Sequence, residues 1–255
     1  MRVTLFALAG LMLAACATPE EALTPEAAME GAIAAAVLDA GRPPEDTARD
    51  AARKPALLLA FAGVAPGQFV AEMLPGGGYF TRLLSTTVGP QGRVIALVPQ
   101  AAAAAAPDQI NPVRALAATP AYANVTVETP AGVMSPSILV DVVWTAQNYH
   151  DIHAYYGAEA AAATNAAVFN ALKPGGVYLI VDHAALPGTG VREARTLHRI
   201  DVETVKAEVT AAGFVLEGES PALANAQDPR TAIVFDPAIR GRTDQFVLKF
   251  RKLAT

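Results

Sequence analysis

The spacing of apolar residues from position 69 onward changes twice, and each change predicts a new element. Positions 69–74 form a short apolar run broken only by Glu72, and the Pro-Gly-Gly-Gly that follows at 75–78 must turn the chain. From 79 to 88 the apolar side chains recur at helical spacing, and 93–98 form a second apolar run. This order predicts a strand, a glycine turn, a helix and a second strand, which together make a βαβ unit.

Apolar runs and helical patterns alternate along the rest of the chain. Before the βαβ unit, helical patterns begin at Thr24, Asp46 and Pro55. After it, we expect strands at residues 125–128, 138–145, 177–181, 214–219 and 245–251, with helices at 112–118, 158–172 and 201–212. Strands that alternate with helices favour a single α/β domain on a Rossmann-like sheet of seven strands, with added N-terminal helices.

The first residues carry the pattern of an export signal, with Arg2, an apolar run and then Cys16. The Leu-Ala-Ala-Cys that ends this run resembles the lipobox of bacterial lipoproteins, in which the signal is cut before the cysteine and the cysteine is lipidated. We therefore expect residues 1–15 to be a signal peptide, 16–43 a tether with an N-terminal helix, and 44–255 the α/β domain. The resemblance implies a protein exported to the cell envelope and lipid-anchored there, in the outer membrane facing the periplasm.

Charge and composition exclude several classes of function. The formal net charge is −5, only 17% of the residues are charged, and no cluster of Lys and Arg offers a nucleic-acid surface. The chain has no Gly-x-Ser-x-Gly turn, and its one thiol, Cys16, lies at the tether, which argues against nucleophilic hydrolysis. The glycine turn also lacks the Gly-Lys-Ser/Thr ending of a phosphate loop. We expect a small-molecule substrate, no nucleic acid, and membrane contact through the lipid anchor.

Polar residues gather where the predicted strands end. Ligands of open α/β sheets bind beyond the carboxyl ends of the strands, where the strand order reverses. Three polar segments fall at this edge: Gly76 to Tyr79, Asn148 to Asp151, and Asp182 with His183. All four histidines of the chain lie on or just after it: His150, His153, His183 and His198. We predict that His150 or His183, oriented by Asp151 or Asp182, acts as a general base.

Other interpretations of these polar residues stay open. The motif His150-x-x-His153, together with Asp182 or His183, contains ligands that zinc or iron accepts, although our interpretation favours no metal. We assign substrate contact to Asp182, His198 and Arg240. Arg240 alternatively marks only a polar hairpin tip before the last strand.

The glycine turn and several later blocks resemble class I S-adenosylmethionine-dependent methyltransferases. In that family an acidic residue precedes a Gly-x-Gly turn, and Glu72, Gly76 and Gly78 take the matching positions. LKPGG followed by VYLIVDH resembles the family's fifth strand. The blocks PGGGYFTRLL, NYHD, DHAALPGTG, HRID and VFDPAIRGRTDQFVLKF together resemble a subfamily of exported methyltransferase-like proteins. This chain departs from the family at Leu74, where a glycine is usual, and at Val98, where a carboxylate usually holds the ribose.

The resemblance implies a mixed sheet whose last strand is antiparallel, and S-adenosylmethionine as the cofactor. The residues that would hold the cofactor lie at the glycine turn and after the fourth strand: Glu72, Gly76, Gly77, Gly78, Tyr79, Asn148 and Tyr149. The implied activity is methyl transfer to a small molecule that the sequence does not name. The alternative is a non-methylating protein that keeps the fold and binds another ligand in its pocket.

Overall fold

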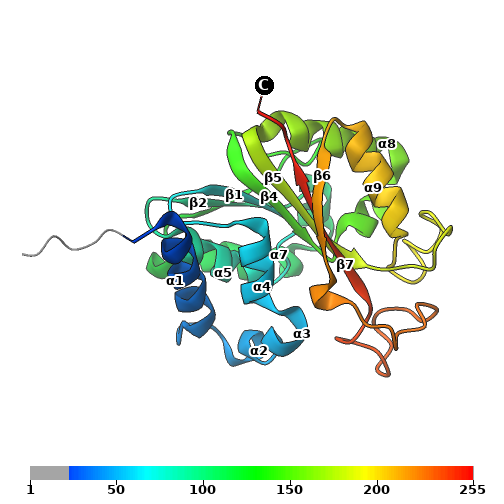
Figure 1. The fold of residues 1–255 in the computed structure, drawn as a ribbon, viewed down its shortest axis with the longest axis horizontal. Coiled ribbons are helices and arrows are strands. Elements are labelled where there is room, and N and C mark those ends of the chain that lie inside the picture. Colours follow the sequence, from blue (N-terminus) through cyan, green and yellow to red (C-terminus); the bar gives the residue numbers. More distant parts are fainter. Residues whose placement is uncertain (1–22, 255) are drawn as a thin grey trace, which may run out of the picture.

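Residues 23–254, described by a computed structural model, form one seven-stranded sheet covered by helices (Figure 1). The strand order is β3-β2-β1-β4-β5-β7-β6, and β7 runs antiparallel to both of its neighbours while the other pairs are parallel. The predicted Rossmann-like mixed sheet is thereby confirmed. The expected signal peptide, residues 1–15, and Cys16 lie outside the described residues. The strands are β1 Phe69–Met73, β2 Arg93–Leu97, β3 Val125–Glu128, β4 Val140–Ala146, β5 Leu172–His183, β6 Val215–Ser220 and β7 Gln245–Arg251.

Most of the helices contribute to one of two apolar clusters, one on each face of the sheet. Along β4, Trp144 belongs to the cluster that includes α1, α4 and α5, whereas its neighbour Val143 belongs to the cluster that includes α8 and α9. This alternation is the pleat of a strand that is buried on both faces. The helices are α1 Pro25–Leu38, α2 Pro44–Thr47, α3 Asp50–Arg53, α4 Pro55–Ala62, α5 Tyr79–Val88, α6 Gln100–Ala105, α7 Pro107–Ala117, α8 Tyr149–Ala171 and α9 Val202–Ala211.

The sequence predicts one helix from Asp46, but this segment forms two single helical turns, α2 and α3. Asp46 forms ion pairs with Arg49 and with Arg82 of α5, at 2.6 and 2.8 Å. Asp50 holds Arg42 through two hydrogen bonds of 2.7 and 2.8 Å. Charge pairing of this kind fixes each short turn against its neighbours where helix propensity alone would not.

Helix α8 begins about nine residues before the predicted start, directly after β4. Gly157, with φ 85°, interrupts the helical geometry inside it. The segment 149–156 is therefore a separate helical piece ahead of the predicted helix. As a result, His150 and Asp151 lie in the first helical turn at the edge of the sheet.

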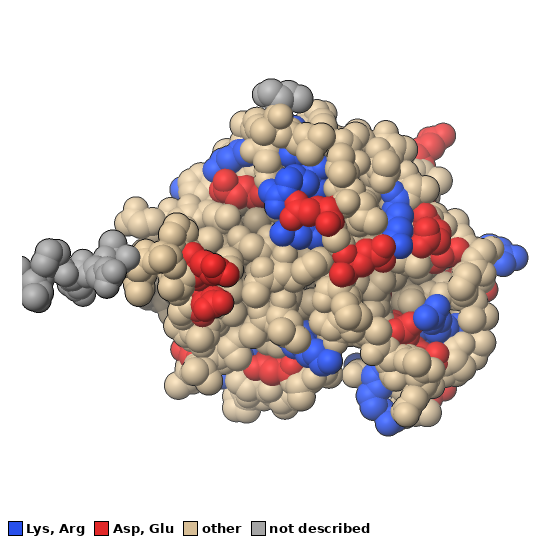
Figure 2. Space-filling view, in the orientation of Figure 1, with Lys and Arg blue, Asp and Glu red and all other residues tan. Residues whose placement is uncertain are grey.

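The surface carries charges of both signs. Figure 2 shows acidic and basic side chains intermixed on the face it draws, with neither sign forming an extended patch. No helix within residues 23–254 has the length and hydrophobicity needed to cross a bilayer.

Candidate functional site

The carboxyl ends of β1 and β4 lie side by side, and the strand order reverses between them. The glycine turn follows β1, and Asn148 follows β4. The amide of Asn148 donates to the carbonyls of Leu74 and Ala146, at 3.1 and 2.8 Å, and so ties the two strand ends together. Parallel strands that separate at this point leave the hollow in which ligands of such folds bind.

The turn itself needs left-handed backbone at three positions. Leu74, Gly76 and Gly78 have φ values of 53°, 55° and 84°. A Cβ on Gly78 would lie 2.9 Å from the Leu116 side chain, which would have to move, and the φ of 84° would strain any other residue there. Leu74 takes a strained conformation at the position where the methyltransferase resemblance expects glycine, and strain of this kind costs about 1–2 kcal/mol.

Three adjoining cavities open at this edge, and Gln147 lines all of them. The glycine-turn cavity, of about 250 Å³, is lined by Glu72, Gly76, Gly77, Tyr79, Arg53 and Asn148 among others. The histidine cavity, of about 660 Å³, is lined by Asn148, His150, Asp151, His183, His198 and Phe235 among others. The connecting cavity, of about 370 Å³, is lined by Arg53, His183, Arg240 and Thr243 among others. We refer to the three together as the carboxyl-edge site.

Glu72 lies at the end of β1 and is almost fully buried. Burial raises the pKa of its carboxyl group to about 7, although the hydrogen bond from Thr81 and the charge of Arg53 oppose this rise. The Thr81 hydroxyl donates to one carboxylate oxygen at 2.5 Å. A buried carboxylate with so little pairing is well suited to bind a cationic group.

Arg53 faces the same cavity from α3. Its guanidinium lies 4.7 Å from the ring centroid of Tyr79 and donates to the Gln147 side chain at 2.8 Å. Burial lowers the pKa of Arg53, and none of the ion pairs among the described residues includes it. Because a guanidinium has five donors, most of them stay available for an anionic group in the cavity.

Two aromatic residues expected at the cofactor have different surroundings. Tyr79 lines the glycine-turn cavity, but its hydroxyl donates to Asp50 at 2.6 Å, so it offers only its ring. Tyr149 is fully buried, and its hydroxyl bonds with Glu208 and Asn165 at 2.8 and 2.7 Å. The expectation that Tyr149 lines the pocket is therefore wrong, because its side chain points from α8 toward α9.

His150 has no free nitrogen. Its Nδ1 lies 2.7 Å from Asp182, and its Nε2 lies 3.1 Å from Nδ1 of His198 and 3.2 Å from Asp151. Burial favours the neutral ring, yet the adjacent carboxylates of Asp182 and Asp151 raise the pKa of His150 to about 10. These contacts contradict our assignment of His150 as a general base, since a base must be unprotonated and open to the substrate.

The pKa of His183 shifts in the opposite direction from the pKa of His150. Burial lowers the pKa of its ring to about 4, which Asp182 only partly opposes, so the ring is neutral at pH 7. Its Nδ1 bonds with the hydroxyl of Thr243 at 2.8 Å, and no partner of its Nε2 is found among the described residues. His183 lines both the histidine cavity and the connecting cavity. A neutral imidazole nitrogen that faces a cavity can accept a proton from a ligand.

The remaining predicted residues divide into two groups. His198 and Asp151 line the histidine cavity, and Arg240 lines the connecting cavity. Asp182 is fully buried and accepts hydrogen bonds from the backbone of His150 and His183. Asp182 therefore orients other residues, and our assignment of it to substrate contact is wrong.

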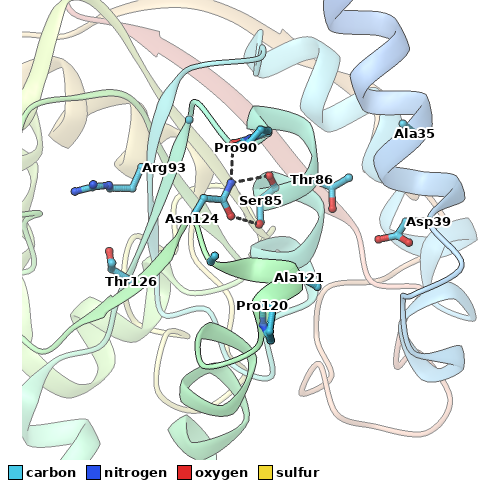
Figure 3. Close-up of a pocket in the computed structure, with 13 residues that line it drawn as sticks. Ala35, Asp39, Ser85, Thr86, Pro90, Arg93, Pro120, Ala121, Asn124 and Thr126 are labelled. Atoms are coloured by element: carbon cyan, nitrogen blue, oxygen red, sulfur yellow. Dashed lines mark hydrogen bonds between the residues drawn. The ribbon is translucent and has the colours of Figure 1, made fainter.

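A larger cavity, of about 740 Å³, lies at the amino ends of β2 and β3 (Figure 3). In this amino-edge pocket, the amide of Asn124 donates to the carbonyls of Ser85 and Gly89, at 3.0 and 2.8 Å, and its oxygen accepts from the Ser85 hydroxyl. Figure 3 shows these hydrogen bonds, which join Asn124 to Ser85 and to the backbone next to Pro90. No histidine lines this pocket, and the bonds of Asn124 and Ser85 stabilise the loops around it.

Gln147 and Thr243 belong to the carboxyl-edge site, and our sequence predictions gave neither of them a role. Gln147 has φ 65°, and its side chain bonds with Arg53 and Gln245 at 2.8 and 2.9 Å. No residue pattern signals these contacts, because they join segments more than 90 positions apart. Arg53 lies within the helical pattern that begins at Asp46.

No protein-family model matches this chain. Solved structures do resemble it, among them a SAM dependent methyltransferase from Aquifex aeolicus, with 16% identity over 83% of this chain and 94% of that one, and a TM-score of 0.55. An S-adenosylmethionine dependent methyltransferase from Mesorhizobium loti has 18% identity over 80% and 99%, with a TM-score of 0.57. The [4+2]-cyclase SpnF has 16% identity over 85% and 86%, with a TM-score of 0.55. The chain therefore has the fold of class I S-adenosylmethionine-dependent methyltransferases.

Proposed function

We propose that the protein binds S-adenosylmethionine at the carboxyl-edge site and transfers its methyl group to a small molecule. The observation that carries this proposal is the charge arrangement of the glycine-turn cavity, where a buried carboxylate and a guanidinium without an ion-pair partner face one space. An amino acid end with one ammonium and one carboxylate matches that arrangement. The fold of the neighbours then favours S-adenosylmethionine as the molecule with that end.

The residues present fit the amino acid end of this cofactor better than its ribose. Glu72 would hold the ammonium, Arg53 the carboxylate, and the backbone at Gly76 and Gly77 would allow close approach. Val98 is only 3% exposed and carries no hydrogen-bonding side chain for the ribose. A carboxylate contact contributes about 1.5–3 kcal/mol, so its loss should weaken binding by about ten- to a hundredfold.

The cofactor supplies an electrophilic methyl group when it is bound. His183 is the residue of this site best placed to take the proton that a substrate hydroxyl or amine loses when it is methylated. Its neutral ring faces the histidine cavity and is oriented by Thr243. Phe235 and Val234 form part of the apolar wall of that cavity.

The alternative is a non-methylating protein that uses the same cavities for another ligand. Val98 favours this alternative, because the ribose contact of the methyltransferase family is missing. The likeness to a [4+2]-cyclase adds to it, since a protein named for a different reaction has the same fold.

Calorimetry with S-adenosylmethionine and S-adenosylhomocysteine on the full-length protein tests the proposal. We expect saturable binding of both, and Arg53→Gln should weaken it by about ten- to a hundredfold. The matched control is Arg93→Gln, because Arg93 lines the amino-edge pocket and should not matter. Absence of binding, or equal weakening by both substitutions, would leave the ligand-binding alternative as the better account.

We also propose that Cys16 is lipidated and anchors the protein to the membrane, facing the periplasm. The support is the apolar export segment that ends in Leu-Ala-Ala-Cys. A Cys16→Ser variant should accumulate as unprocessed precursor. Normal processing and membrane attachment of this variant would refute the lipid anchor.

A further inference from the structure

We propose that His150, Asp151 and His198 form a binding site for a divalent transition metal ion of the zinc class. Nε2 of His150 lies 3.1 Å from Nδ1 of His198 and 3.2 Å from Oδ1 of Asp151. Nδ1 of His198 lies 3.5 Å from the same Asp151 oxygen. Two imidazole nitrogens and one carboxylate oxygen thus form a small triangle.

The size of this triangle matches a metal ion. Zinc binds imidazole nitrogen and carboxylate oxygen at about 2.0–2.2 Å, so ligand atoms in a tetrahedral site lie about 3.3 Å apart. The three distances bracket that value. Two histidines and one carboxylate are also a ligand set that zinc and other first-row divalent ions accept.

The side chain behind the triangle prepares His150 for this role. Asp182 lies 2.7 Å from Nδ1 of His150 and also accepts the backbone N–H groups of His150 and His183. A carboxylate in this position holds the proton on Nδ1, so a metal ion that displaces the Nε2 proton of the charged ring meets a nitrogen directed at the other two ligands. Histidines that bind metals in proteins are held in this way.

Two further features of the triangle fit a ligand-binding position. Oδ1 of Asp151 is buried, and it makes no hydrogen bond of acceptable geometry among the described residues. His198 has φ 55°, a strained conformation for a residue other than glycine. Buried polar atoms without partners and strained residues both gather at sites that bind ligands.

The site is open on one side. All three residues line the histidine cavity of about 660 Å³, so a fourth ligand can come from that cavity. Metal sites with three protein ligands and one open position bind water or a substrate oxygen there. We infer that the cavity takes a small molecule with an oxygen donor, such as a hydroxyl or carboxylate group.

This triangle differs from the His150-x-x-His153 set that the sequence suggests. Nε2 of His153 lies 2.9 Å from Glu208 of α9, so the His153 ring points away from the cavity. The partner of His150 comes instead from His198, 48 residues away. The metal proposal does not rest on the proposed methyl transfer, because none of its three ligands is assigned to the cofactor.

Titration of the chelator-treated, full-length protein with Co²⁺ and Zn²⁺ tests the site. We expect one ion per chain, the visible absorption bands of four-coordinate Co²⁺, and displacement of Co²⁺ by Zn²⁺. His198→Ala and Asp151→Asn should each weaken Zn²⁺ binding by about a hundredfold or more, and Asp182→Asn by about ten- to a hundredfold. His153→Gln is the matched control, on the same helix, and should bind as the native protein does.

Several results would overturn the metal site. These are the absence of stoichiometric binding, unchanged binding by His198→Ala, or equal loss in His153→Gln. Melting temperatures show whether each variant is folded, and His198 and Asp151 are chosen because neither is fully buried. Calorimetry with S-adenosylhomocysteine is a separate readout, so failure of cofactor binding and failure of metal binding can be told apart.

Discussion

Cavities lie at both edges of the sheet, and they differ in how their polar groups are paired. The amino-edge pocket is larger, at about 740 Å³, but Asn124 and Ser85 in its wall bond with each other and with backbone carbonyls. At the carboxyl edge, the cavities are smaller and hold Glu72, Arg53 and His183 with bonding capacity left over. Incomplete pairing of buried polar groups, rather than volume, distinguishes the candidate site.

Residues with strained backbone conformations also lie at the carboxyl edge rather than at the amino-edge pocket. Five non-glycine residues of the described chain have positive φ, and three of them line the carboxyl-edge cavities: Leu74, Gln147 and His198. None of the five lines the amino-edge pocket. Strain that the surrounding structure maintains is typical of ligand-binding positions.

The largest expected effect comes from a buried ion pair in the segments that follow β5 and β6. Arg199 and Asp228 are both fully buried, with nitrogen–oxygen distances of 2.9 and 3.2 Å. Arg199→Met should lower the free energy of unfolding by about 3–5 kcal/mol, because it leaves the Asp228 charge buried and unpaired. Urea unfolding measures this loss. The exposed Arg195→Met control should stay within about 0.5 kcal/mol, and a similar small change in Arg199→Met would contradict the role of the pair.

The next effect is a pH dependence that only the carboxyl edge should show. The pKa of Glu72 rises from 4.5 to about 7 on folding, so the folded state binds the proton more tightly than the unfolded state. The Glu72 contribution therefore lowers stability as pH rises through this window, by up to about 3 kcal/mol, and levels off above about pH 7. Glu72→Gln should remove this contribution, which unfolding at pH 5 and pH 8 would measure. An unchanged pH dependence, compared with Glu159→Gln as the exposed control, would show that Glu72 is not buried as described.

The smallest expected effect comes from replacing two asparagines that have similar contacts, one of which should affect stability alone and the other both stability and ligand binding. Asn124 and Asn148 each use their amide to hold two or more backbone carbonyls, one at each edge of the sheet. Asn124→Ala and Asn148→Ala should each lower stability by about 1–3 kcal/mol. Only Asn148→Ala should also weaken S-adenosylhomocysteine binding in calorimetry. Weaker binding in both variants would remove the distinction between the two edges.

Much of the fold follows from local patterns. The spacing of apolar residues located β7 at 245–251, the helix after the glycine turn, and the seven-stranded sheet. These elements are predictable because side-chain periodicity decides which face is buried. The two turns α2 and α3 were not predicted as separate elements, and their ion pairs with Arg42 and Arg82 involve residues outside the local pattern.

The candidate site was predictable only in part. Ligands of open α/β sheets bind where the strand order reverses, and this rule places Gly77 and Asn148 at one hollow. Both residues line the glycine-turn cavity. The roles of the histidines could not be predicted, because His150 and His183 acquire opposite pKa shifts from burial and from side chains far away in the sequence. The contact between His150 and His198 depends likewise on how the segment after β5 folds back.

Hydrogen–deuterium exchange of the full-length protein, with and without saturating S-adenosylhomocysteine, tests the central claim most directly. The claim is that the carboxyl edge of the sheet, and not the larger amino-edge pocket, binds the ligand. We predict slower exchange in residues 74–79 and 147–151, and unchanged exchange in residues 85–93 and 120–126. Protection confined to residues 85–93 and 120–126, or no protection at all, would contradict the account.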